Sequence, residues 1–105
     1  MNNRFDERFE SIRALAGEMQ RLAVLALQQY TPVVDSIISS NSKDVHYIEH
    51  TLDHLLDFCF FEPMVQLFRR LCRYYYDIDP NATASYVYTY RDMWDSEEPK
   101  ESPPR

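Results

Sequence analysis

The sequence predicts an all-α protein, a compact bundle of four to five helices followed by a disordered polar tail. The 105-residue chain has a single glycine, so it lacks the residues that tight β-hairpins and glycine-rich phosphate loops require. Its prolines at 32, 63 and 80 stand where helices can begin. Apolar residues recur every three or four positions through most of the chain, which is the period of one helical face.

Length and composition favour one domain. A chain of 105 residues, 45% hydrophobic and 27% charged, can bury one core. We expect this domain to span 1–95, and the proline-rich, aperiodic segment 96–105 to be disordered. The first ten residues lack the apolar core of a signal peptide, and the apolar run at 22–27 is shorter than the roughly 20 residues that cross a bilayer. A cytoplasmic location without membrane contact is therefore expected.

The first helix is predicted over 4–30. Its first half is strongly amphipathic, whereas residues 22–27 are apolar on nearly all sides, which predicts burial in the protein or in an interface. Thr31 and Pro32 suit a cap and a first-turn proline, and so predict a second, short helix that ends before the loop at 39–42. The alternative is a proline kink in one continuous helix.

Two antiparallel helices are predicted next, over 43–60 and 63–77. Ser42 is the expected cap of the first, and the short connection between them predicts a helical hairpin. Cys59 and Cys72 fall on the inner faces of these helices. Their expected axial offset, on the order of 12 Å, is too long for a disulfide bond. We therefore expect two buried free thiols.

A last helix is predicted over 80–94. Asp79 followed by Pro80 is a typical helix start. The stretch SYVYTY alternates and is rich in strand-forming residues, but a single strand would have no partner in this chain. Helix is therefore favoured over strand. The expected inner face consists of Ala82, Tyr86, Val87, Tyr90, Met93 and Trp94.

The three histidines of the chain recur every four residues, at His46, His50 and His54. His46 and His50 on adjacent turns, together with Asp53, could bind a single metal ion such as zinc. However, this strip lies opposite the apolar face of its helix, and no further histidine could supply a distant ligand. A solvent-exposed polar face is favoured, with a metal-binding bundle as an alternative. No activated nucleophile accompanies the histidines, so neither an enzyme nor a cofactor is expected.

Three arginines, Arg69, Arg70 and Arg73, face outward beside tyrosines. Such a strip could contact phosphates and stack on bases, which makes a nucleic-acid accessory protein a second alternative. The net charge of −6 opposes nucleic-acid binding. We expect instead that Asp53 and Asp57 of the preceding helix neutralise Arg69 and Arg70 across the hairpin.

Aromatic residues make up 14% of the chain, and tyrosine, tryptophan and arginine are enriched at the centres of protein interfaces. The long first helix also exposes apolar area unless another surface covers it. We therefore expect a small, non-enzymatic interaction or accessory protein that forms a homodimer or binds a protein partner. The expected interface consists of Tyr74, Tyr76, Tyr86, Tyr88, Tyr90 and Trp94.

Overall fold

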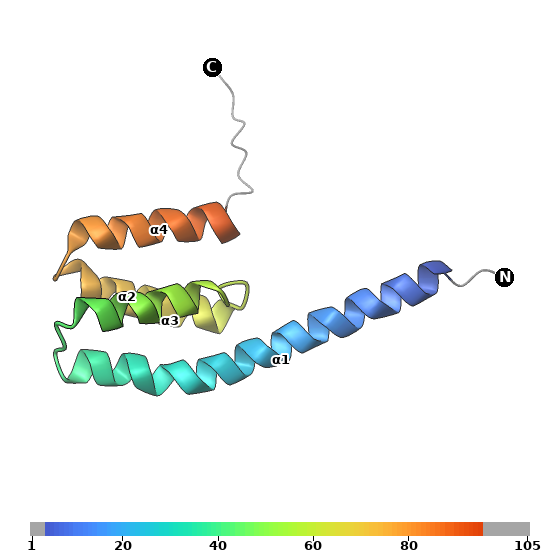
Figure 1. Ribbon diagram of the computed structural model, residues 1–105, viewed down its shortest axis with the longest axis horizontal. Helices are drawn as coiled ribbons and strands as arrows, with labels where there is room; N and C mark the ends of the chain where they lie inside the picture. The colour runs from blue at the N-terminus through green and yellow to red at the C-terminus, as the bar shows by residue number, and fades with distance from the viewer. Residues whose placement is uncertain (1–3, 96–105) are drawn as a thin grey trace, which may run out of the picture.

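The computed structural model describes residues 4–95, with side chains from residue 7 onward. It contains four helices (Figure 1), α1 (Arg4–Ser39), α2 (Val45–Leu56), α3 (Glu62–Tyr76) and α4 (Pro80–Trp94), and the described part of the chain has no strand. The predicted all-α class is confirmed. The predicted disordered segment 96–105 lies outside the described residues.

Helix α1 is one continuous helix of 36 residues with Pro32 inside it. The prediction of a separate short helix was therefore wrong, and the kinked alternative describes the structure. Proline has no N–H, so Pro32 makes no helical hydrogen bond to the Gln28 carbonyl one turn earlier. The hydroxyl of the preceding residue, Thr31, donates to the Leu27 carbonyl at 2.6 Å. Figure 1 shows that α1 changes direction partway along its length. The helix ends at Ser39, and two residues later Asn41 has a left-handed φ of 55° that turns the chain away from the helical path.

The remaining helices begin at polar caps or prolines. Asp44, not Ser42 as expected, caps α2, because its carboxylate accepts the Tyr47 N–H at 3.1 Å. The turn after α1 extends past Ser42 and moves the start of α2 to residue 45. Asp79 caps α4 by accepting the Ala82 N–H at 3.0 Å, directly before Pro80. The predicted last helix is confirmed over its full length.

Helices α2 and α3 form the expected antiparallel hairpin, and the C-terminal half of α1 and helix α4 pack on either side of it (Figure 1). The core lies where α1, α2 and α3 meet. Its fully buried large side chains are Val34, Ile37, Ile48, Leu52, Leu55, Met64, Leu71 and Tyr75. Cys59 and Cys72 are buried free thiols, as predicted, and burial raises the pKa of both to about 12.

Helix α4 lies at the edge of the bundle. Thr83 is its one buried residue in the described range. Tyr86 and Tyr90 of the expected inner face are half-buried, but Val87 and Met93 are exposed, because α4 packs mainly on α3 and only part of its surface is covered. One side of α4 is thus left open beside α3.

Candidate functional site

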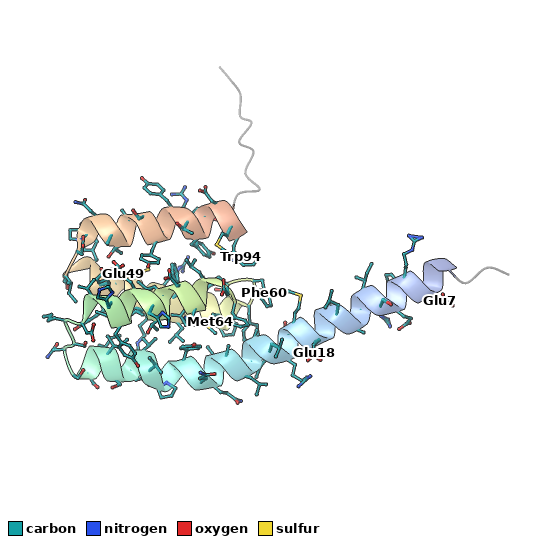
Figure 2. The ribbon with its side chains drawn as sticks, viewed as in Figure 1. Glu7, Glu18, Glu49, Phe60, Met64 and Trp94 are labelled. Carbon is teal, nitrogen blue, oxygen red and sulfur yellow. The ribbon has the colours of Figure 1, made fainter. Side chains whose placement is uncertain are left out.

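The N-terminal part of α1 projects beyond the bundle (Figure 2). We call residues 7–22 the arm, and all of them are exposed. Four large apolar side chains, spaced by three or four residues, form what we call the arm strip. Its members are Ile12 (62% exposed), Leu15 (62%), Met19 (43%) and Leu22 (47%). At about 100° per residue they fall within an arc of roughly 80° on one side of the helix.

The arm strip continues the face with which α1 packs on the bundle. At about 100° per residue, Ala23, Ala26, Val34 and Ile37 lie on the same side of the helix as the strip. These four residues are buried, between 0% and 7% exposed, against the hairpin. One apolar face therefore runs along the whole helix, and its N-terminal part lies in solvent.

The arm is electrically neutral, whereas the bundle is acidic. Residues 7–22 contain three arginines and three acidic residues. Two of the arginines form ion pairs along the helix, Arg13 with Glu10 at 4.0 Å and Arg21 with Glu18 at 2.5 Å. Residues 23–95 contain five basic and ten acidic residues, so the net negative charge of the described chain lies on the bundle.

Four of the six aromatic residues of the expected interface contact other parts of the bundle. The hydroxyls of Tyr74 and Tyr86 and the indole N–H of Trp94 donate to backbone carbonyls of neighbouring segments, over 2.7, 3.3 and 2.8 Å. Tyr90 stacks on Phe68 with ring centroids 5.7 Å apart. These contacts join α4 and α3 to neighbouring segments, so the four side chains stabilise the bundle itself.

The other two aromatic residues, Tyr76 and Tyr88, are 58% and 65% exposed. Tyr76 lies at the end of α3 and lines a groove between α3 and α4, whereas Tyr88 of α4 does not line it. The six aromatic residues therefore do not form one continuous exposed surface.

The groove between α3 and α4 has a volume of about 560 Å³. Its lining combines buried apolar side chains of α3 with aromatic and charged side chains from both helices. The residues are Val65, Phe68, Arg69, Cys72, Arg73, Tyr76, Asp77, Thr83, Val87, Tyr90, Arg91 and Asp95.

The arginine strip is divided between two surfaces. Arg69 and Arg73 line the groove, whereas Arg70 lies on the side of α3 that faces α1. There its guanidinium contacts the Asp35 carboxylate at 2.5 Å. The expected pairing of Arg70 with Asp53 or Asp57 was therefore wrong, because α1 lies close enough to α3 for Asp35 to be the partner.

The histidine strip lies on the outer side of α2, as predicted. His46 and His50 are exposed and His54 is half-buried near Tyr30 of α1. The rings of His50 and His54 are 4.4 Å apart, and Nδ1 of His54 donates to the His50 carbonyl at 2.9 Å, so that nitrogen is already used. In residues 4–95 no group of three or more metal-binding side chains is arranged around one point. Metal binding through His46, His50 and Asp53 stays a prediction.

A polar contact inside the bundle joins α2 to α3 and α4. Tyr75 is fully buried, and its hydroxyl donates to the Glu49 carboxylate at 2.5 Å. Burial, followed by the hydrogen bond to Glu49, raises the pKa of Tyr75 above its ordinary range. Burial and the nearby Asp53 carboxylate raise the pKa of Tyr86 in the same direction. Both phenols are neutral at physiological pH and serve as hydrogen-bond donors.

No protein-family model, curated protein or solved structure matches the chain. Among residues 4–95, no helix has the length and apolar character needed to cross a membrane. The arm strip was absent from the interface expected from the sequence. The signal that could have identified it is a helix much longer than the bundle on which it packs.

Proposed function

We propose that this protein is a small, non-enzymatic interaction protein that forms a homodimer through its arm. The observation that carries the proposal is the exposed arm strip, which continues the packing face of α1 beyond the bundle. A soluble amphipathic helix buries such a face against another surface. A second copy of the arm offers a surface of matching length, charge and apolar character.

The exposed area is sufficient for a small interface. The four side chains of the arm strip expose on the order of 400 Å² of apolar surface, as much as the largest patch on a typical monomer. Two arms facing each other would hide about twice that area before flanking residues are counted. That area, about 800 Å², is below the roughly 1,200–2,000 Å² that stable specific interfaces bury in total, and is typical of weaker interfaces. A dimer of low to moderate affinity is expected.

Charge favours an antiparallel arrangement of the two arms. Two neutral arms do not repel each other, whereas two acidic bundles do. An antiparallel pair places the bundles at opposite ends of a helix pair about 24 Å long, well beyond the Debye length of about 8 Å at physiological salt. A parallel pair would place the bundles side by side.

The test compares Ile12→Glu with Ala14→Glu by sedimentation equilibrium over a range of protein concentrations. Both residues are exposed on the arm, but Ala14 lies on the side away from the arm strip. The parent and Ala14→Glu should approach twice the 12.6 kDa mass of the chain. Ile12→Glu should weaken association by about 100-fold or more, because it places a carboxylate in each copy of an apolar contact.

Circular dichroism on each variant establishes that the bundle is folded. A monomeric parent at about 100 μM, or equal association of both variants, contradicts the proposal. Tyr88→Ala is the third variant, because Tyr88 belongs to the interface expected from the sequence. If Tyr88→Ala abolishes association while Ile12→Glu preserves it, the contact is on α4 and not on the arm.

A further inference from the structure

We propose that the groove between α3 and α4 binds an amphipathic helix of a partner protein that carries acidic residues beside its apolar strip. This site is separate from the arm and lies at the opposite edge of the bundle, where α4 leaves part of α3 uncovered. The shape of the groove, its floor and its charges each support this occupant.

The groove is long and open. Its lining residues run from Val65 to Asp77 along α3 and its C-terminal cap, and from Thr83 to Asp95 along α4 and its C-terminal cap. Each range covers about three helical turns, or roughly 18 Å at 1.5 Å per residue. Tyr76 stays 58% exposed on its rim, so an occupant would keep one side in water. An amphipathic helix of three to four turns fits a groove of this kind.

The floor of the groove is apolar. Val65, Phe68 and Cys72 are buried beneath it, and the ring of Tyr90 stacks on Phe68. Burial raises the pKa of the Cys72 thiol to about 12, so the thiol is neutral and adds no negative charge. Val87 is 37% exposed at the α4 side and extends the apolar surface. The floor can therefore receive the apolar strip of a helix.

Three arginines give the groove its charge. Arg69 and Arg73 come from α3 and Arg91 from α4, so positive charge flanks the floor on both sides. In the described part of the chain none of the three forms an ion pair, whereas Arg13, Arg21 and Arg70 all do. Guanidinium groups bind carboxylates through paired N–H donors. Acidic residues on the incoming helix would provide the missing partners.

The position of the acidic residues favours a short acidic helix over a nucleic acid. Asp77 lies at the end of α3 and Asp95 just after α4, at opposite ends of the groove. A phosphate backbone that ran through the groove would meet both carboxylates. A peptide with acidic residues near its middle would meet the arginines and avoid like charges at its ends.

The probe is a synthetic fluorescent helical peptide of about four turns, with leucines along one face and glutamates beside them. A matched peptide has glutamine in place of each glutamate, and a single-stranded oligonucleotide serves as the third probe. Fluorescence anisotropy measures binding to the full chain. We expect the acidic peptide to bind with a Kd below about 100 μM, and the glutamine peptide to bind about tenfold more weakly.

The protein variants form a matched pair. Arg69→Gln/Arg91→Gln removes charge from both sides of the groove and should weaken binding of the acidic peptide by about tenfold. Arg70→Gln, next to Arg69 on the other side of the same helix, should change binding less than twofold. Val87→Glu, at an exposed position, should abolish binding, because it places a carboxylate on the apolar surface of the groove, and it provides a second test if the double variant does not fold.

Each other outcome overturns the proposal. One such outcome is equal binding of both peptides, and another is equal binding by the Arg69→Gln/Arg91→Gln and Arg70→Gln proteins. Arginine-dependent binding of the oligonucleotide alone would assign the groove to nucleic acid. Ile12→Glu separates this proposal from the homodimer, because it should leave peptide binding intact. Peptide binding lost in Ile12→Glu would place the peptide on the arm.

Discussion

Replacement of Tyr75 by phenylalanine removes one hydroxyl from the centre of the bundle and keeps the ring. That hydroxyl donates to the Glu49 carboxylate at 2.5 Å and joins α3 to α2. Tyr75 is fully buried, so no water could replace it without repacking. Glu49 is half-buried and would lose a donor in the variant. The free energy of unfolding should therefore fall.

Hydrogen bonds to charged groups contribute about 1.5–3 kcal/mol to stability. Because Glu49 retains contact with solvent, we expect a loss near the lower end, about 1.5–2 kcal/mol. In a domain of this size such a loss lowers Tm by roughly 10 °C. Tyr76→Phe is the matched control: its ring is 58% exposed, and the change should be within about 0.5 kcal/mol.

The assay is urea unfolding followed by far-ultraviolet circular dichroism, with both substitutions in the Ile12→Glu background. In that background, association does not add to the apparent stability. Glu49→Gln should cost less than Tyr75→Phe, because an amide oxygen still accepts the phenol proton. Equal unfolding free energies for the Tyr75→Phe and Tyr76→Phe proteins would refute this account of the buried contact.

Two further predictions concern the thiols and the arm. Burial raises the pKa of Cys59 and Cys72 from the ordinary 9.0 to about 12, so their contribution to stability is complete below pH 9 and is lost as the pH rises toward 12. Urea unfolding at stepped pH should show a shallower decline in Cys59→Ala/Cys72→Ala. A Cβ at Gly17 would meet no atom within 4 Å, so Gly17→Ala should stabilise the arm helix by about 0.5–1 kcal/mol. Sedimentation equilibrium should then show dimerisation strengthened about two- to fivefold, and an unchanged Kd would mean that arm helicity does not limit association.

Local sequence signals predicted three of the four helices well. The Asp79-Pro80 pair placed the start of α4, and helical spacing placed α2 and α3. Pro32 misled the prediction for α1, because proline suits both a first helical turn and a kink. The choice depends on tertiary contacts, which the local sequence does not contain: in the structure the helix continues through the proline, and Val34 and Ile37 are buried against the hairpin.

The candidate sites depend on packing that the local pattern does not contain. The partner of Arg70 was predicted within the α2–α3 hairpin. The actual partner, Asp35, belongs to α1 and lies 35 residues earlier in the chain. Likewise, the spacing of the arm strip indicates an apolar face and gives no information on where the bundle ends. Whether Ile12 is covered depends on how far α1 extends beyond α2 and α3, which is a property of the assembled fold.

A single helix that belongs to both the bundle and the arm has a kinetic consequence. A separate helix as short as the arm is marginal in water, because the first turn must be ordered before any hydrogen bond compensates it. Here α1 is already helical where it packs on the bundle, from the fully buried Ala23 onward. The arm therefore needs no nucleation of its own and forms by extending that helix. Fraying is therefore confined to the free N-terminal end. Two such arms meet as largely formed helices, so that only the frayed turns remain to be ordered at the moment of encounter.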